Sequence, residues 1–188
     1  MWNLTELTLK ETKNAQRSLI ECCDVFPLPR NDGNGNDSCY RLVFCDRHGG
    51  VTLHDTSKAR EITRNVPKEQ IVKCCKFSPD GSSIATGHSD GTLQIWDARR
   101  LEFKKLLTCG DGLVKGCGYL IQDLGDVVAS LSISGTLRVW DAFSRQLLGF
   151  MNFESKLRGI ATSPVNSQIC VALEDKIVIV NVHRPEFD

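Results

Sequence analysis

A pattern of about ten residues that recurs along the chain constrains its fold most strongly. HSDGTLQIWD is followed by the similar SISGTLRVWD, and the frame also fits DRHGGVTLHD and, with one residue deleted, LEDKIVIVN. Trp2-Asn3 resembles the end of one further copy. The units end near Asn3, Asp55, Asp97, Asp141 and Asn181. Their spacing of roughly 40 to 52 residues predicts a repeat architecture in which each unit packs on its neighbours.

The unit from Ile71 to Leu107 predicts four short β-strands joined by tight turns. Its middle reads FSPDGSSIATGHSDGTLQIWD, in which two turns place glycine directly after aspartate. Glycine supplies the positive φ that hairpin turns require. The strands are expected to begin at Ile71 and to occupy 83–87, 92–96 and 103–107. They predict an all-β chain of four-stranded antiparallel sheets, with the glycine- and asparagine-rich segment 31–37 as a loop insertion.

These residues resemble the WD40 family. Trp96-Asp97 and Trp140-Asp141 carry the family's signature dipeptide, and residues 77–81 carry its first-hairpin turn. The resemblance covers nearly the whole of residues 1–188 and implies WD40-type β-propeller blades packed face to face around a channel. Because the family typically closes with seven or eight blades, we expect this region to belong to a larger propeller. Alternatively, Leu4 to Leu9 supplies the last outer strand and closes a small ring.

The resemblance also implies a buried hydrogen-bond chain of aspartate, histidine, serine or threonine, and tryptophan in a blade. The matching signature positions are Thr86, Asp90, Trp96 and Asp97 in one repeat, and Ser130, Trp140 and Asp141 in the next. The family's histidine precedes the first strand, where residues 66–70 read VPKEQ, and it is absent from the next repeat as well. We therefore expect these blades to depend more on apolar packing than on the network.

Charge and cysteine content narrow the class of partner and the cellular compartment. Lysine plus arginine and aspartate plus glutamate each number 23, so the net charge is zero, which disfavours nucleic acid as a partner. The nine cysteines lack a regular framework spacing, and no apolar signal segment follows Met1. We expect buried free thiols in a cytoplasmic or nuclear protein. No apolar run reaches the roughly 18 residues of a membrane helix, so no membrane partner is expected.

Sequence motifs for catalysis are not found. There is no GxxxxGK[ST] phosphate loop and no GxSxG elbow. Cys39, Cys45, His48 and His54 lie near one another in sequence, but no CxxC or HxxxH pair supports a zinc site, and we interpret them as turn and strand residues. The chain is predicted not to be an enzyme, and no catalytic, cofactor-binding or metal-binding residue is assigned.

The expected function is a scaffold or adaptor that binds other proteins or peptides in a multiprotein complex. The resemblance implies docking on the face formed by the turns between second and third strands and the loops before first strands. On that face we expect Arg47, Lys73, Ser89, Lys115, Ile133, Arg158 and Glu174. Further blades, a partner or self-association would complete the propeller. The alternative is a sensor propeller of a larger switch protein such as an apoptosome-like NTPase.

Overall fold

A computed structural model describes residues 19–28, 39–67, 70–110, 112–120, 127–163 and 165–183. The described residues are almost entirely β-strand, which confirms the predicted fold class. Asn3, the segment from Leu4 to Leu9 and the insertion 31–37 lie outside them, so these three predictions remain as made. Within the described ranges, no helix has the length and apolar character needed to cross a membrane.

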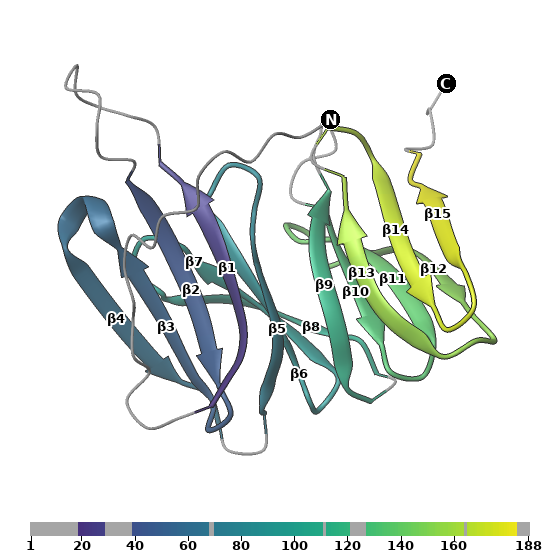
Figure 1. Ribbon diagram of the computed structural model, residues 1–188, viewed down its shortest axis with the longest axis horizontal. Helices are drawn as coiled ribbons and strands as arrows, with labels where there is room; N and C mark the ends of the chain where they lie inside the picture. Colours follow the sequence, from purple (N-terminus) through teal and green to yellow (C-terminus); the bar gives the residue numbers. More distant parts are fainter. Residues whose placement is uncertain are drawn as a thin grey trace, which may run out of the picture.

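The strands form four antiparallel sheets, each corresponding to one blade (Figure 1). Blade 1 contains β1 (Ile20–Pro27), β2 (Tyr40–Asp46), β3 (Gly50–Asp55) and β4 (Arg60–Asn65), with a short 3-10 helix, η1 (Thr56–Lys58), before β4. Blade 2 contains β5 (Val72–Phe77), β6 (Ser83–His88), β7 (Thr92–Asp97) and β8 (Phe103–Thr108). Blade 3 contains β9 (Val114–Leu120), β10 (Val127–Ser132), β11 (Thr136–Asp141) and β12 (Leu147–Asn152). Blade 4 contains β13 (Leu157–Thr162), β14 (Gln168–Leu173) and β15 (Ile177–Asn181).

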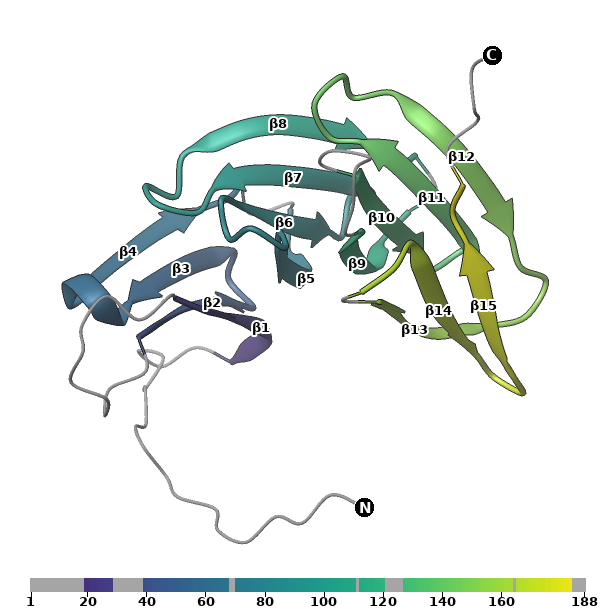
Figure 2. The ribbon, with the colours of Figure 1, turned by 90° about the horizontal axis from the view of Figure 1, so that it is seen from above.

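The four blades follow one another around an arc (Figure 2). Their innermost strands are neighbours in order, since β1 contacts β5, β5 contacts β9 and β9 contacts β13. In blades 1 to 3 the outermost position is taken by β4, β8 and β12. Blade 4 has no described strand in that position, because its sheet runs β13-β14-β15.

In blades 1 to 3, the aspartate that ends the third strand caps the turn after it. Asp97 accepts hydrogen bonds from the backbone N–H groups of Arg99 and Arg100, and Asp141 accepts from those of Phe143 and Ser144. Burial opposes ionisation of Asp97, but these N–H donors lower the pKa of its carboxyl on balance. The chain then passes through a left-handed residue, at Ala59, Leu101 and Arg145 in the three complete blades. The signature aspartates thus turn the chain toward the outermost strand.

Hydrophobic clusters fill the three interfaces between consecutive blades. In β6 the neighbouring residues Ile84 and Ala85 are both fully buried, yet they pack into different clusters, one against blade 1 and the other against blade 3. Trp96 faces the blade 1 interface, and Trp140 occupies the equivalent place between blades 2 and 3. The middle strands are therefore buried on both faces, which explains their nearly continuous apolar runs.

The blade 2 network contains a histidine, which corrects the sequence-based expectation. Trp96 Nε1 donates to Thr86 Oγ1 at 2.8 Å, and Thr86 Oγ1 lies 2.8 Å from His88 Nε2. His88 Nδ1 lies 3.1 Å from the backbone oxygen of Gln70. One assignment satisfies every group: the indole donates to threonine, threonine to Nε2, and Nδ1–H to the Gln70 carbonyl. The histidine lies at the end of β6 rather than before β5, where the family pattern places it.

Asp90 lies beside this hydrogen-bond chain, and its carboxylate bonds to the turn that follows it. The carboxylate accepts from the backbone N–H of Thr92 at 3.0 Å and from the Thr92 hydroxyl at 2.7 Å. Burial raises its pKa, but the Thr92 and Gln70 hydrogen bonds outweigh burial and lower it. The Gln70 side chain also accepts from Gln94 Nε2 at 2.8 Å. Gln70 thus connects Asp90 and Gln94 where the family pattern places a histidine.

Blade 3 uses a cysteine at the corresponding place. Trp140 Nε1 donates to Ser130 Oγ at 3.0 Å, and Cys109 Sγ lies 3.4 Å from the same oxygen. All three residues are buried. This blade therefore keeps the tryptophan–hydroxyl hydrogen bond with a thiol as the third group, and the greater dependence on apolar packing stays a prediction for both blades.

Candidate functional site

The turns between second and third strands lie along one face of the arc of blades, which we call the turn face. Arg47, Ser89, Ile133 and Glu174 each sit in such a turn, one from each blade. Lys73, Lys115 and Arg158 follow at the second residue of β5, β9 and β13. Antiparallel pairing places these strand starts beside the ends of β6, β10 and β14. The structure therefore brings all seven predicted positions to one face.

The basic side chains of this face are mostly engaged in contacts inside the molecule. Arg47 lies 3.1 Å from the carboxylate of Glu21, and Lys73 lies 3.5 Å from the same carboxylate. Because Lys73 belongs to blade 2 and Glu21 to blade 1, the second contact joins the two blades. The hydrogen bond from Arg47, partly offset by burial, lowers the pKa of Glu21. Lys115 Nζ donates to the backbone oxygen of Leu157 at 2.6 Å and joins blades 3 and 4. These bonds give the basic residues a structural role at the turn face.

The other turn positions differ in their availability to a partner. Arg158 pairs with Glu174 at 2.7 Å, and both side chains are exposed. Ser89 Oγ accepts from the backbone N–H of Ile71 at 3.1 Å. Ile133 is 60 % exposed although it is apolar. Among the seven positions, Ile133 offers the apolar contact that partner anchors favour.

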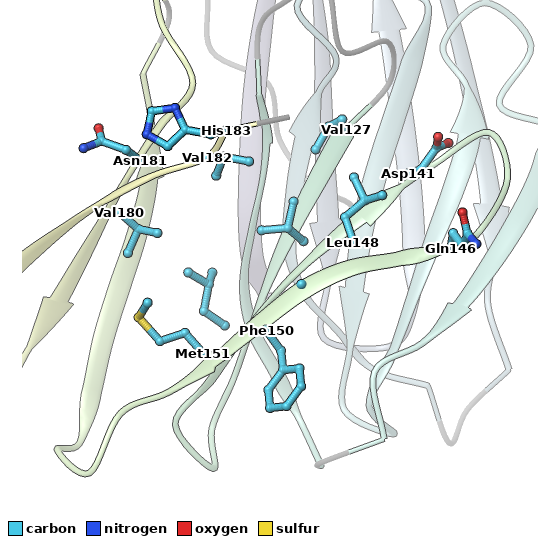
Figure 3. Close-up of a pocket in the computed structure, with 13 residues that line it drawn as sticks. Val127, Asp141, Gln146, Leu148, Phe150, Met151, Val180, Asn181, Val182 and His183 are labelled. Atoms are coloured by element: carbon cyan, nitrogen blue, oxygen red, sulfur yellow. The ribbon is translucent and has the colours of Figure 1, made fainter. Parts of the chain in front are cut away.

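A second candidate surface is a pocket of about 470 Å³ between the outer parts of blades 3 and 4 (Figure 3). Its wall on blade 3 includes Leu148 and Met151 of β12, and its wall on blade 4 includes Val180 of β15 and Val182 just beyond it. Most of the lining is apolar. The complete set of lining residues is Val127, Leu137, Val139, Asp141, Gln146, Leu148, Gly149, Phe150, Met151, Val180, Asn181, Val182 and His183.

The pocket borders an unpaired edge of β15 within the described residues. β15 pairs with β14 alone, in a register that sets Gln168 opposite Asn181. Val178 and Val180 pack toward the blade 3 interface, whereas Ile177 and Ile179 point to the other face and are 71 % and 63 % exposed. In blades 1 to 3 a fourth strand occupies the place beyond the third strand. The pocket therefore lies where a fourth strand of blade 4 would pack on β12.

The sequence pattern offered Leu4 to Leu9 as a candidate for the last outer strand, but nothing in it predicted the pocket. The lining combines β12 with β15, which are separated along the chain by blade 4's inner strands. The exposed apolar run of β12, with Leu147, Leu148, Phe150 and Met151 all exposed, was the available signal. An outer strand that carries apolar residues toward solvent indicates that something packs on it.

The comparisons with known proteins agree with the sheet architecture. The family described as WD domain, G-beta repeat, matches residues 61–97. This chain is a WD40-repeat protein. Over 147 residues it is 29 % identical to WD repeat-containing protein 70 of Xenopus tropicalis, a match that covers 73 % of this chain and 23 % of that protein. Over 46 residues it is 46 % identical to the serine-threonine kinase receptor-associated protein of Dictyostelium discoideum, covering 24 % and 16 %.

Two further matches extend the same result. Over 143 residues the WD40 chain is 24 % identical to human telomerase Cajal body protein 1, which covers 64 % of this chain and 26 % of that protein. The designed Ika4 protein superposes with a TM-score of 0.72 and 15 % identity, covering 94 % of this chain and 100 % of Ika4, and this likeness concerns the fold alone. The chain spans about a quarter or less of the length of these natural relatives.

Proposed function

We propose that this WD40 chain is a non-catalytic interaction scaffold that receives an extended segment of a partner protein beside β15. The carrying observation is the coincidence of an unpaired strand edge with an apolar pocket. The edge offers backbone N–H and C=O groups, which give affinity in strand addition, and the pocket takes alternate side chains, which gives specificity. A strand with apolar residues at every second position fits this site.

The chemistry of the partner follows from the lining. The apolar part of the lining favours aliphatic or aromatic side chains and consists of Leu148, Met151, Val180 and Val182. Asp141, at one end of the pocket, favours a basic or hydrogen-bond-donating residue there. Ion pairs at a rim guide orientation more than they contribute affinity. The preferred ligand is therefore an extended apolar segment with a donor at one end.

A second docking surface is proposed at the turn face, around Ile133. Its support is the exposure of an apolar side chain in a turn. One relative is named receptor-associated, and this name supports a protein-binding role for this chain. A relative named for the Cajal body, a nuclear structure, favours the nucleus over the cytoplasm for this chain. The sensor-propeller alternative has no supporting observation among the described residues.

The test uses two glycines whose added side chains have room. Nothing lies within 4 Å of a Cβ built on Gly149 or on Gly159. Gly149 lines the pocket, and Gly159 lies in β13 of blade 4. Gly149→Trp fills the pocket and is expected to reduce the affinity for partner proteins, measured as their retention, by at least about tenfold. A tenfold decrease corresponds to a loss of about 1.4 kcal/mol of binding free energy. The matched Gly159→Trp variant is expected to retain them.

Equal retention by both variants would contradict docking in the pocket. The segment Leu4 to Leu9 is the other candidate occupant, and Leu7→Asp separates the two cases. If a partner strand fills the place, Leu7→Asp leaves partner retention unchanged. If the chain's own segment fills it, Leu7→Asp increases exchange of the β15 amides in the isolated protein and frees the pocket for other ligands.

A further inference from the structure

Three cysteines from three strands converge at the interface of blades 1 and 2. The sulfur atoms of Cys22, Cys45 and Cys75 all lie within 4.8 Å of one another. Cys22 on β1 and Cys45 on β2 are opposite each other in the strand register, and Cys75 belongs to β5 of the next blade. All nine cysteines of the chain are described and none is in a disulfide.

We propose that Cys22, Cys45 and Cys75 form a thiolate site for a soft closed-shell metal ion of the zinc class. Sulfurs spaced up to 4.8 Å apart lie at most about 2.8 Å from their common centre, against a zinc–sulfur bond of about 2.3 Å. Each sulfur then moves inward by about 0.5 Å or less, which rotation about χ1 supplies. The donor set determines the metal class, because thiolates select zinc and cuprous ions over magnesium and calcium.

The surroundings fit a metal that is held in the core but reaches it from solvent. Cys45 is fully buried and Cys75 is 2 % exposed, whereas Cys22 is half-buried and provides the route of entry. Within the described residues no carboxylate or imidazole joins the trio, so water would take the fourth position of a tetrahedral ion.

The site links two blades that apolar packing already holds together. Val43, Val51 and Val72 belong to the same buried cluster as Cys45 and Cys75, and Cys22 packs against that cluster. A metal with ligands from both blades would stabilise the folded state, because the unfolded chain does not preassemble the three sulfurs. This role is separate from the proposed docking pocket, which lies between blades 3 and 4.

Two pairs of adjacent cysteines provide the controls. Cys23 follows Cys22 but is exposed, and Cys74 precedes Cys75 but lies 3.9 Å from the Val114 oxygen of blade 3. Cys22→Ser is expected to weaken binding of Zn²⁺ by at least about tenfold, since it removes one of three ligands. Cys23→Ser and Cys74→Ser are expected to leave the affinity within about twofold. We would measure binding to the reduced, metal-free chain by calorimetry.

Two readouts on the wild-type chain avoid any dependence on variant folding. Co²⁺ bound at the site is expected to give thiolate charge-transfer absorption at one equivalent, and Zn²⁺ is expected to protect Cys22, but not Cys23, from alkylation. The proposal is overturned if no saturation occurs at one equivalent or if Cys22→Ser and Cys23→Ser bind equally well. It is also overturned if two of the three thiols form a disulfide under conditions in which Zn²⁺ does not bind.

Discussion

Trp96 and Thr86 are ten residues apart in the chain and are joined by a hydrogen bond of 2.8 Å from the indole N–H to the hydroxyl. Trp140 and Ser130 repeat this bond at 3.0 Å in the next blade. In both blades the hydroxyl has a further partner, which is His88 in one and Cys109 in the other. The same position of the repeat therefore keeps its tryptophan and hydroxyl, while the third group changes from an imidazole to a thiol.

Replacement of Trp140 tests how much the packing of the signature tryptophan contributes to stability. Trp140→Ala empties a buried aromatic site between blades 2 and 3, and the free energy of unfolding is expected to fall by about 3 to 5 kcal/mol. Trp140→Phe keeps most of the ring volume but leaves Ser130 without its indole donor, and it is expected to cost about 1 to 3 kcal/mol. Denaturant unfolding measures both losses. An unchanged midpoint for Trp140→Ala would contradict the assigned strand register.

The pH dependence of stability tests His88. Burial lowers the pKa of His88, and the Gln70 carbonyl and Asp90 oppose burial only in part. The unfolded chain then binds a proton more readily than the folded chain. Stability is fully present above the unfolded pKa of about 6.5 and decreases as the pH falls from there toward the lower folded pKa.

The variant His88→Gln isolates this effect, because glutamine does not titrate. The free energy of unfolding of the wild-type chain is expected to decrease between pH 6.5 and the folded pKa of His88, while that of His88→Gln stays flat over the same window. Loss of stability from the capping aspartates begins at lower pH, since their unfolded pKa is about 3.9. Parallel profiles for the two proteins would show that His88 is not buried as a neutral group.

A glycine pair tests the contact between blades 1 and 2. Gly81 has φ +67°, and a Cβ built there would collide with the ring of Phe26. Gly81→Ala is expected to destabilise by at least about 2 kcal/mol, from backbone strain together with overpacking. Gly149→Ala, in a strand with open space, is expected to be neutral or to stabilise by up to about 1 kcal/mol. Thermal unfolding distinguishes them, and equal melting temperatures would exclude the close approach of Phe26 to this turn.

Ile133 tests the turn face. Ile133→Asp is expected to change the free energy of unfolding by no more than about 0.5 kcal/mol, because the side chain is 60 % exposed. If partners dock on this face, the substitution weakens their binding by about 1 kcal/mol or more. Glu174→Ala serves as a comparison at the equivalent turn of blade 4, where the charged side chain pairs with Arg158. Unaltered binding by Ile133→Asp would remove the turn face as a docking surface.

Local sequence signals predicted the strands well because turn chemistry is local. The turn at Ser89-Asp90-Gly91 was recognised from aspartate followed by glycine, and Gly91 has φ +82°. The signature Trp96 and Thr86 were assigned to a common network, which their hydrogen bond confirms. These features depend on residues within about ten positions of one another.

The missed features depend on contacts between blades or on an unusual position. His88 was overlooked because the family pattern directs the search to the loop before β5, whereas here the imidazole comes from the end of β6. Cys45 was weighed with Cys39, His48 and His54 on the basis of sequence proximity. The fold instead brings it to Cys22 and Cys75, and the adjacent cysteine pairs in two repeats were the only available signal.

Addition of a partner strand to the edge of β15 is best tested by hydrogen exchange of the β15 amides. Exchange would be followed for Ile177 to Asn181 in the isolated chain and in the presence of a retained partner protein. If a partner strand adds there, the amides pointing away from β14 exchange at least about tenfold more slowly in the complex, and Gly149→Trp abolishes this protection. Unchanged exchange at β15 in a complex that forms normally would contradict strand addition.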